Sequence, residues 1–316
     1  MPLRGVFLSL LKRLRWRLSD RYYKPAVRAA VSRIAPHVQH IAAIFPHEGK
    51  LSTYTLPAYP EPEWRDDRSL FAIPPKPFWA GYSNSVGTYL QSGHDDISTM
   101  RKIIGESGAE IEKLGRILEL GVAGGRLIRH LADLAQTQEI WGVDVWASAI
   151  TWCNEKLSPP FHFATTTVTP HLPFEDRSFG LVFAGSVWTH LDDLAEAWAL
   201  EVHRVLRPDG RFYFTINDRS AVRIFQGGGT PENRARYVER ARPEGWDQWL
   251  KWLERNPGYQ RFARGEAQMV TMGRSTQSNV LWDVNYLLKR WGPSWRLCSV
   301  TPEAYGHQTG VLLARV

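Results

Sequence analysis

Short apolar runs alternate with stretches of helical spacing through the middle and the end of the chain. The first of these runs, Ile117–Leu120, has the composition that a strand buried on both faces of a sheet needs. The runs that predict strands are Ile117–Leu120, Glu139–Val143, Phe161–Thr165, Phe179–Ala184, Arg211–Ile216, Arg296–Val300 and Thr309–Ala314. Apolar positions with helical spacing predict helices over Ile97–Glu106, Leu127–Leu134 and Ala147–Leu157. Alternating strands and helices predict an α/β fold.

A glycine-rich turn follows the first of these strands, in the sequence RILELGVAGGR at residues 116–126. A strand, a turn of residues without bulky side chains and a helix form a nucleotide-type ligand site, because the backbone N–H groups can approach the ligand closely. A dinucleotide-binding turn counted from Gly121 requires a small residue at position 126. Arg126 stands there instead, which argues against NAD.

Two acids accompany this turn. Glu119 lies on the strand just before Gly121, and Asp144 ends the next apolar run. An acid at the tip of the neighbouring strand can accept hydrogen bonds from both ribose hydroxyls of an adenosine ligand. The pair of acids therefore indicates an adenosine-containing cofactor.

At this point the sequence resembles the class I S-adenosylmethionine-dependent methyltransferases. The resemblance continues through LPFEDRSFGLVFAGSVWTHL (172–191) and RVLRPDGRFYFT (204–215). It implies a Rossmann-like seven-stranded methyltransferase sheet that closes with an antiparallel pair, and S-adenosyl-L-methionine as cofactor. The cofactor-binding positions that it implies are Glu119, Gly121, Ala123, Gly125, Asp144, Val145, Thr167, Ala184 and Gly185.

The sequence departs from the family pattern at three places. Ala123 replaces the middle glycine of the turn, and Gly180 stands where the family usually has aspartate. Val168 occupies the position at which many members carry an acid for the adenine amino group. Backbone groups or the hydroxyl of Thr167 or Thr169 would then take that role.

The loop at the end of the fourth strand, Gly185–His190, lies where open α/β sheets hold their ligands. His190 is the first candidate for a general base, followed by Asp218 and His94; alternatively, His190 only positions the loop. Thr189 and Asp192 fit a capping box that opens a helix to Leu206. Candidate acceptor contacts are Tyr82, His94 and Trp188, for which packing of the aromatic rings is the alternative.

The chain divides into three predicted parts. Residues 1–35 form a basic amphipathic helical arm, residues 36–96 a proline-rich linker and lid segment, and residues 97–316 the catalytic domain. A helical cap is inserted between strands five and six at about residues 219–280. Its tryptophans, Trp246, Trp249 and Trp252, form either an aromatic wall for an acceptor or the packing of the cap itself.

The formal net charge of +7 is concentrated in the arm. Residues 1–28 hold eight basic residues and one acid, and the remaining 31 basic and 31 acidic residues balance. A nucleic-acid enzyme would carry a basic face around its active site, so nucleic acid is not an expected partner. The arm's apolar stripe could dock on protein or lie on an anionic membrane. Cys153 and Cys298 form no metal-binding pattern, and a reducing cytoplasm fits them.

These features predict a cytoplasmic methyltransferase that acts on a small molecule, through O-methylation of a sugar, glycan or lipid-linked metabolite, and is held at the inner face of the membrane if the arm binds lipid. A nucleic-acid or protein methyltransferase would keep the reaction and change the acceptor. A non-catalytic cofactor-binding partner protein would keep Glu119 and Asp144 and lack an acceptor pocket.

Overall fold

A computed structural model describes residues 71–231, 246–273 and 278–316 of the 316-residue chain, with the backbone alone for 246–249. The predicted arm at 1–35 and most of the predicted linker lie outside these ranges. Residues 59–145 and 149–316 belong to one compact unit, whose described part contains the central sheet.

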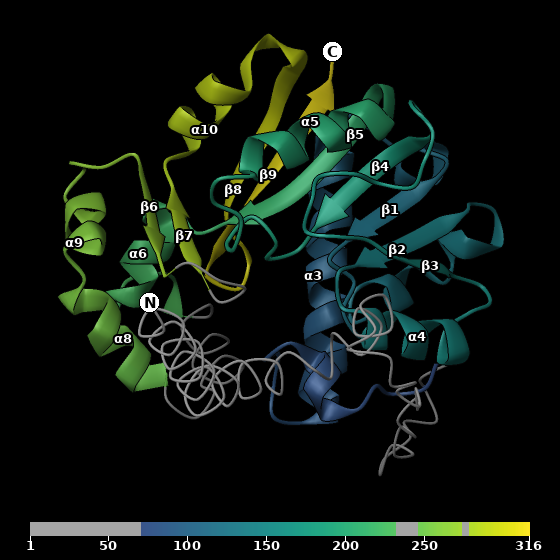
Figure 1. Cartoon of the computed structure of the whole chain (residues 1–316), viewed down its shortest axis with the longest axis horizontal. Helices are drawn as coiled ribbons and strands as arrows, with labels where there is room; N and C mark the ends of the chain where they lie inside the picture. The colour runs from purple at the N-terminus through teal and green to yellow at the C-terminus, as the bar shows by residue number, and fades with distance from the viewer. Residues whose placement is uncertain (1–70, 232–245, 274–277) are drawn as a thin grey trace, which may run out of the picture. The chain divides into compact units, whose positions relative to one another are not determined.

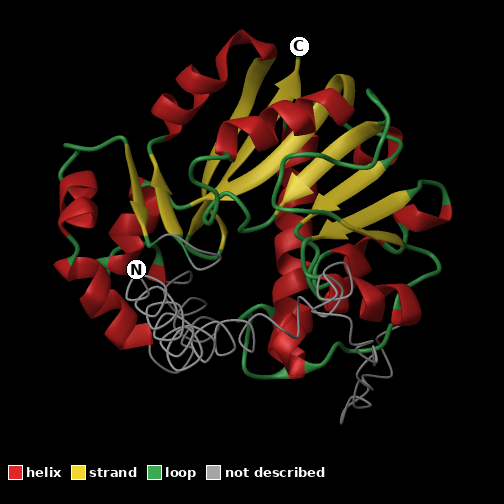
Figure 2. Ribbon diagram, in the orientation of Figure 1, coloured by secondary structure: helices red, strands yellow, loops and turns green. Residues whose placement is uncertain are grey.

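Seven strands form this sheet in the order β3-β2-β1-β4-β5-β9-β8, with the strands labelled in Figure 1 and coloured yellow in Figure 2. The first five strands are parallel, and β9 is antiparallel to both β5 and β8. The seven-stranded α/β fold predicted from the sequence is therefore confirmed. The strands are β1 (Ile117–Leu120), β2 (Ile140–Asp144), β3 (His162–Thr165), β4 (Phe179–Ala184), β5 (Leu206–Ile216), β8 (Trp295–Tyr305) and β9 (Gln308–Arg315).

Helices connect most of these strands (Figure 1). Short 3-10 turns lie in the segments between helices and strands. The helices are α3 (Val86–Glu106), α4 (Ala147–Lys156), α5 (Ala195–Val205), α6 (Arg219–Phe225), α8 (Trp246–Arg255), α9 (Pro257–Ala263) and α10 (Val284–Trp291). The 3-10 turns are η2 (Lys76–Trp79), η3 (Ile111–Lys113), η4 (Ile128–Leu131), η5 (Leu134–Gln136) and η6 (Gly292–Ser294).

The segment after the glycine turn differs from the predicted helix over Leu127–Leu134. It consists of turns and the 3-10 elements η4 and η5. The Nε atom of Arg129 donates to the Gly125 carbonyl at 2.9 Å, and the His130 N–H donates to Leu127 at 3.0 Å. The arginine side chain thus bonds the carbonyl that the Arg129 N–H would bond in an α-helix.

Two further helix boundaries differ from the prediction. Helix α3 begins at Val86 rather than Ile97, because the Ser85 side chain caps it by accepting from the Thr88 N–H at 3.2 Å. The predicted capping box is wrong: α5 begins only at Ala195, and its N-cap Leu194 provides no side-chain hydrogen bond. Thr189 donates instead to the Ser186 carbonyl at 2.7 Å.

The insertion between β5 and β8 contains a small hairpin as well as helices. Its strands β6 (Met269–Met272) and β7 (Asn279–Trp282) pair antiparallel, so the predicted cap is not purely helical. A separate hydrophobic cluster joins this hairpin to α6, α8 and α9, through Ala221, Val222, Phe225, Leu253, Tyr259, Phe262, Met272 and Leu281. The hairpin is fixed to the end of β5, because the Trp282 N–H donates to the Asn217 carbonyl at 2.8 Å.

Candidate active site

The glycine turn lies where the carboxyl ends of β1, β2 and β4 meet. The N–H groups of Gly121 and Val122 both donate to the Val143 carbonyl, at 2.8 and 3.1 Å. Gly121 has a φ of +84°, and a Cβ there would lie 2.5 Å from Cγ2 of Val187. The turn therefore requires glycine both for its backbone conformation and for its contact with the loop after β4.

Asp144 supports this turn from the end of β2. Its Oδ2 atom accepts from the Ala123 N–H at 2.7 Å and holds Ala123 at a φ of +44°. A carboxylate can accept several hydrogen bonds at once, so this bond is compatible with a role toward ribose hydroxyls. The structure thus brings Gly121, Ala123 and Asp144 together as the sequence predicted.

Apolar side chains are exposed beside these strand ends. Val145, directly after β2, is 48% exposed, and Val168, after β3, is 65% exposed. Thr167 is also exposed, and its hydroxyl donates to the Thr169 carbonyl at 3.2 Å. Exposed valines at neighbouring strand ends provide apolar surface of the kind that a flat heterocycle covers.

Glu119 is buried within β1, and its Oε2 atom has no hydrogen-bond partner among the residues that the structure describes. Burial raises the pKa of this carboxyl well above its usual range, against the opposing charge of Arg126. A buried acid without a full set of partners favours a cationic group nearby. S-adenosylmethionine carries a sulfonium and an ammonium, so Glu119 fits this cofactor.

Arg126 occupies the centre of a buried polar cluster and is only 5% exposed. Its guanidinium donates to Asp96 at 2.8 Å, to Ser92 at 3.1 Å and to the hydroxyl of Tyr305. It also lies 4.0 Å from the ring centroid of Tyr82. The sequence indicated this residue only as a departure from a dinucleotide turn, because its partners come from α3 and the β8–β9 hairpin.

The loop after β4 is held by a closed set of side-chain hydrogen bonds. Thr215 accepts from the Ser186 N–H at 2.7 Å and donates to Gln308 at 2.6 Å, and Gln308 donates to the Ser186 hydroxyl at 2.8 Å. Ser186 has a φ of +60°, a conformation that costs a non-glycine residue about 1–3 kcal/mol. Side chains from two strands, β5 and β9, therefore stabilise a strained residue directly after Gly185.

His190 lies at the end of this loop with its side chain exposed. Its Nδ1 atom is 2.7 Å from the Ser278 carbonyl oxygen, and the Ser278 hydroxyl donates to the His190 carbonyl at 2.8 Å. A carbonyl oxygen only accepts, so Nδ1 carries the proton and the neutral ring bears its lone pair on Nε2.

The other candidate acceptor-side residues have different surroundings. Asp218 caps α6, where its Oδ1 accepts from the Ser220 and Ala221 N–H groups at 2.8 and 3.2 Å. His94 is exposed on α3, with its ring centroid 5.7 Å from that of His130. Trp188 is fully buried against Phe212, with ring centroids 5.0 Å apart. The prediction of Trp188 as an acceptor contact is therefore wrong, because its ring belongs to the hydrophobic core.

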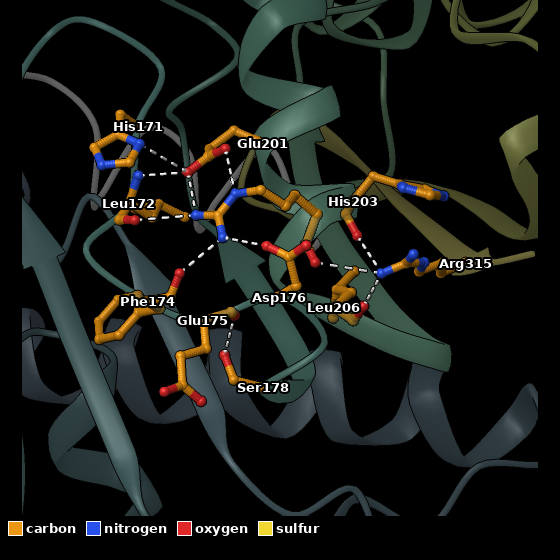
Figure 3. Close-up of polar contacts among 11 residues, drawn as sticks. His171, Leu172, Phe174, Glu175, Asp176, Ser178, Glu201, His203, Leu206 and Arg315 are labelled. Carbon is orange, nitrogen blue, oxygen red and sulfur yellow. Dashed lines mark hydrogen bonds and ion pairs between the residues drawn. The ribbon is translucent and has the colours of Figure 1, made fainter.

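The loop between β3 and β4 is attached to α5 through Arg204, and Figure 3 labels its partners Glu201, Leu172 and Phe174. Arg204 forms two hydrogen bonds to Glu201, at 2.6 and 2.9 Å, and donates to the Leu172 and Phe174 carbonyls at 3.0 and 2.7 Å. The buried Thr166 continues this support, since its hydroxyl donates to the His171 carbonyl at 3.1 Å. The segment beside Thr167 and Val168 is thus positioned by a network that only the folded chain brings together.

No helix in the described ranges is long and apolar enough to cross a membrane. Within the same ranges, no group of three His, Cys, Asp or Glu side chains could hold a metal ion.

The strand order, the glycine turn and Asp144 together define an α/β protein with a nucleotide-type ligand site. Residues 118–214 match the family model described as "Methyltransferase domain". This match supports a class I S-adenosylmethionine-dependent methyltransferase that uses S-adenosylmethionine as its cofactor.

Solved structures with a similar arrangement have low sequence identity to this chain. A crystal structure of a protein from Pyrococcus horikoshii OT3 is 17% identical, with a TM-score of 0.45, and the match covers 69% of this chain and 88% of that chain. A putative S-adenosylmethionine-dependent methyltransferase from Listeria monocytogenes is 10% identical, with a TM-score of 0.47 and coverages of 72% and 99%. One from Clostridium acetobutylicum is 11% identical, with a TM-score of 0.47 and coverages of 70% and 91%.

Proposed function

We propose that the protein methylates an oxygen atom of a small-molecule acceptor, with His190 as the general base. The observation that carries this proposal is the contact between Nδ1 of His190 and the Ser278 carbonyl. It leaves Nε2 as the basic nitrogen on an exposed loop at the end of β4, where open α/β sheets bind their ligands. A base is needed here because a hydroxyl must lose its proton as it is methylated.

S-adenosylmethionine, when bound, supplies an electrophilic methyl group on its sulfonium. The residues that would hold it are Gly121, Ala123 and Gly125 through the turn, Asp144 toward the ribose, and Glu119 through its buried Oε2 atom, which has no partner among the described residues. Val145 and Thr167 would line the adenine side, and Ala184 and Gly185 the side that faces the acceptor. The exposure of Val145 and the orphaned oxygen of Glu119 support this assignment.

Alignment of the two reactants would provide most of the rate acceleration, an effect that can be worth ~7–11 kcal/mol. The hydrogen bonds around Ser186 support this part of the proposal, because they hold the loop between the glycine turn and His190. Removal of the acceptor proton by His190 would raise the reaction rate a further ~10²–10⁴-fold.

A sugar, a glycan or a lipid-linked metabolite is the acceptor class that we propose. The balance of charges after residue 28 supports an acceptor other than nucleic acid. The basic amphipathic arm supports a cytoplasmic enzyme that works at an anionic membrane surface, where lipid-linked acceptors occur.

The proposal can be tested by incubating the purified protein with radiolabelled S-adenosylmethionine and fractionated cell extract. We expect label in a low-molecular-weight or lipid fraction, bound through a linkage that resists mild alkali, as an ether does and an ester does not. Label in protein or nucleic acid, or no transfer while the cofactor binds, would contradict the proposed acceptor class.

A further inference from the structure

A directed chain of hydrogen bonds runs from the buried guanidinium of Arg126 to the lid segment before α3. Arg126 donates to the hydroxyl of Tyr305, and the Tyr305 hydroxyl donates to that of Tyr82 at 3.1 Å. The two tyrosine rings meet edge to face, with centroids 6.0 Å apart. The guanidinium of Arg126 also lies over the ring of Tyr82, so the first and last residues of this hydrogen-bond chain are in direct contact.

The direction of this chain follows from its chemistry. A guanidinium only donates, so the Tyr305 oxygen accepts from it and the Tyr305 proton is directed to Tyr82. The oxygen of Tyr82 is then the acceptor, and its own proton has no acceptor among the described residues. Tyr82 as a whole is half-buried, so part of its surface faces solvent.

The backbone around Tyr82 is strained. Ala80 has a φ of +53° and Ser83 a φ of +74°, on either side of Gly81 and Tyr82. Each non-glycine residue in this conformation costs about 1–3 kcal/mol and persists only where its surroundings hold it. The N–H of Tyr82 donates to the Trp79 carbonyl at 2.9 Å, which closes the turn that presents the side chain.

This chain of hydrogen bonds lies next to both the glycine turn and the loop after β4. A Cβ at Gly185 would lie 2.7 Å from the Tyr305 hydroxyl, so Tyr305 contacts the end of β4. Arg126 follows directly on the glycine turn. Arg129, a second buried guanidinium, donates to the Gly125 carbonyl, and its Nη1 has no partner among the described residues. Two buried guanidinium groups therefore lie next to the turn, that of Arg126 paired with Asp96 and that of Arg129 bonded to the turn itself.

We propose that the Tyr82 hydroxyl donates a hydrogen bond to a carboxylate of a bound ligand, with its proton polarised by Arg126 through Tyr305. Hydrogen bonds in a chain strengthen one another, and a donor strengthened by a buried cation prefers an ionised oxygen. This inference rests on the proposed function, because the ligand is one of the two reactants. The carboxylate belongs either to the amino-acid end of the cofactor or to the acceptor.

The first arm of the test measures binding of two cofactor analogues by calorimetry. S-adenosylhomocysteine carries the amino-acid carboxylate, and 5′-methylthioadenosine lacks it. If the carboxylate is that of the cofactor, Tyr82→Phe weakens S-adenosylhomocysteine about tenfold, the scale of one charge-assisted hydrogen bond, and leaves 5′-methylthioadenosine within twofold. Tyr305→Phe, which interrupts the relay, gives a loss of the same sign.

The second arm uses acetate as the probe on protein saturated with S-adenosylhomocysteine. If the carboxylate belongs to the acceptor, saturation transfer to the acetate methyl group is seen with the wild type and is lost in Tyr82→Phe, while both analogues bind unchanged. Tyr286→Phe is the matched control, because its hydroxyl accepts from Arg290 at 2.7 Å on the exposed face of α10. It should behave as wild type in both arms.

Equal behaviour of Tyr82→Phe and the wild type in both arms would overturn the proposal. An equal loss of affinity for both analogues would also overturn it, because 5′-methylthioadenosine has no carboxylate. Failure of the cofactor assignment on which the proposed function rests is distinguishable, since neither analogue would then bind the wild type. Thermal unfolding of each variant separates these outcomes from loss of the fold.

Discussion

Nδ1 of His190 and the carbonyl oxygen of Ser278 are 2.7 Å apart, which joins the loop after β4 to the β6–β7 hairpin of the insertion. The insertion therefore contacts the part of the molecule that contains the seven-stranded sheet at the side chain of His190, as well as at its backbone. The Ser278 carbonyl selects the His190 tautomer with the proton on Nδ1. The insertion thereby contributes to the chemistry proposed for the site.

Replacing His190 with glutamine should lower turnover about 100-fold or more and leave cofactor affinity unchanged, because a glutamine amide cannot take up the acceptor proton. Turnover with the identified acceptor and calorimetry with S-adenosylhomocysteine would measure the two effects. Ser278→Ala is the weaker change, since it keeps the backbone carbonyl that orients His190 and removes only the hydrogen bond to the His190 carbonyl, so turnover should fall less than in His190→Gln. A His190→Gln enzyme with near-normal turnover would exclude His190 as the base.

Asp144→Ala should weaken S-adenosylmethionine binding by ~1.5–3 kcal/mol, the scale of hydrogen bonds to a charged group. Two effects combine, because the variant loses a ribose acceptor and also the oxygen that holds the Ala123 N–H at 2.7 Å. Calorimetry measures the loss, and Asp193→Ala, which removes an exposed acid, provides the control. Unchanged affinity in a folded Asp144→Ala protein would remove this residue from the cofactor site.

Much of the cofactor side could be predicted from sequence because its elements are local. Gly121 and Ala123 follow a strand within a few residues, and Asp144 ends the next strand, so neighbouring strands bring them together. The apolar runs predicted the strands themselves, whereas the seven-stranded sheet with its antiparallel closing pair was implied by the resemblance to the class I methyltransferases.

The polar cluster around Arg126 could not be predicted in this way. Its partners Asp96 and Tyr305 are 30 and 179 residues distant in the chain. The pairing of Ser186 with Gln308 spans 122 residues. Trp188 was predicted to contact the acceptor because of its position on the loop after β4. That position does not reveal that its ring packs in the hydrophobic core.

Thr215→Val should disturb the loop after β4 while Thr215→Ser preserves it. Valine has nearly the same shape as threonine but leaves the Ser186 N–H and the Gln308 amide oxygen without their partner, at a cost of about 1–3 kcal/mol. Urea unfolding would report this loss. We expect kcat to fall in Thr215→Val with S-adenosylhomocysteine affinity within twofold. If Thr215→Ser were as impaired, the hydroxyl would not be the cause.

The buried Glu119 should make the protein less stable as the pH rises. Because burial raises its pKa, the folded state keeps the proton after the unfolded chain releases it near pH ~4.3. The free energy of unfolding therefore falls above that pH until the pKa of the folded state is passed. Urea unfolding between pH 4.5 and 7 should show this slope in the wild type and a weaker slope in Glu119→Gln.

Glu201 provides a control of opposite sign. Burial alone would raise its pKa, but hydrogen bonds from Arg204 and from the Leu172 N–H lower the pKa overall. Its contribution to stability is present above the pKa of the unfolded chain and is lost as the pH falls through the lowered value. Glu201→Gln should thus lower the free energy of unfolding most at neutral pH. Identical slopes in the wild type and Glu119→Gln would contradict the role of Glu119.

Deleting residues 1–28 should abolish sedimentation of the protein with anionic liposomes. This segment lies outside the described residues, and the prediction rests on its eight basic residues and its apolar stripe. Each basic residue near an anionic surface can contribute ~1 kcal/mol, and salt weakens the attraction because exposed charges are screened over ~8 Å. Binding of S-adenosylhomocysteine should survive the deletion. If the full-length protein ignores anionic liposomes at low salt and the shortened protein aggregates, the arm belongs to the fold or to a subunit interface.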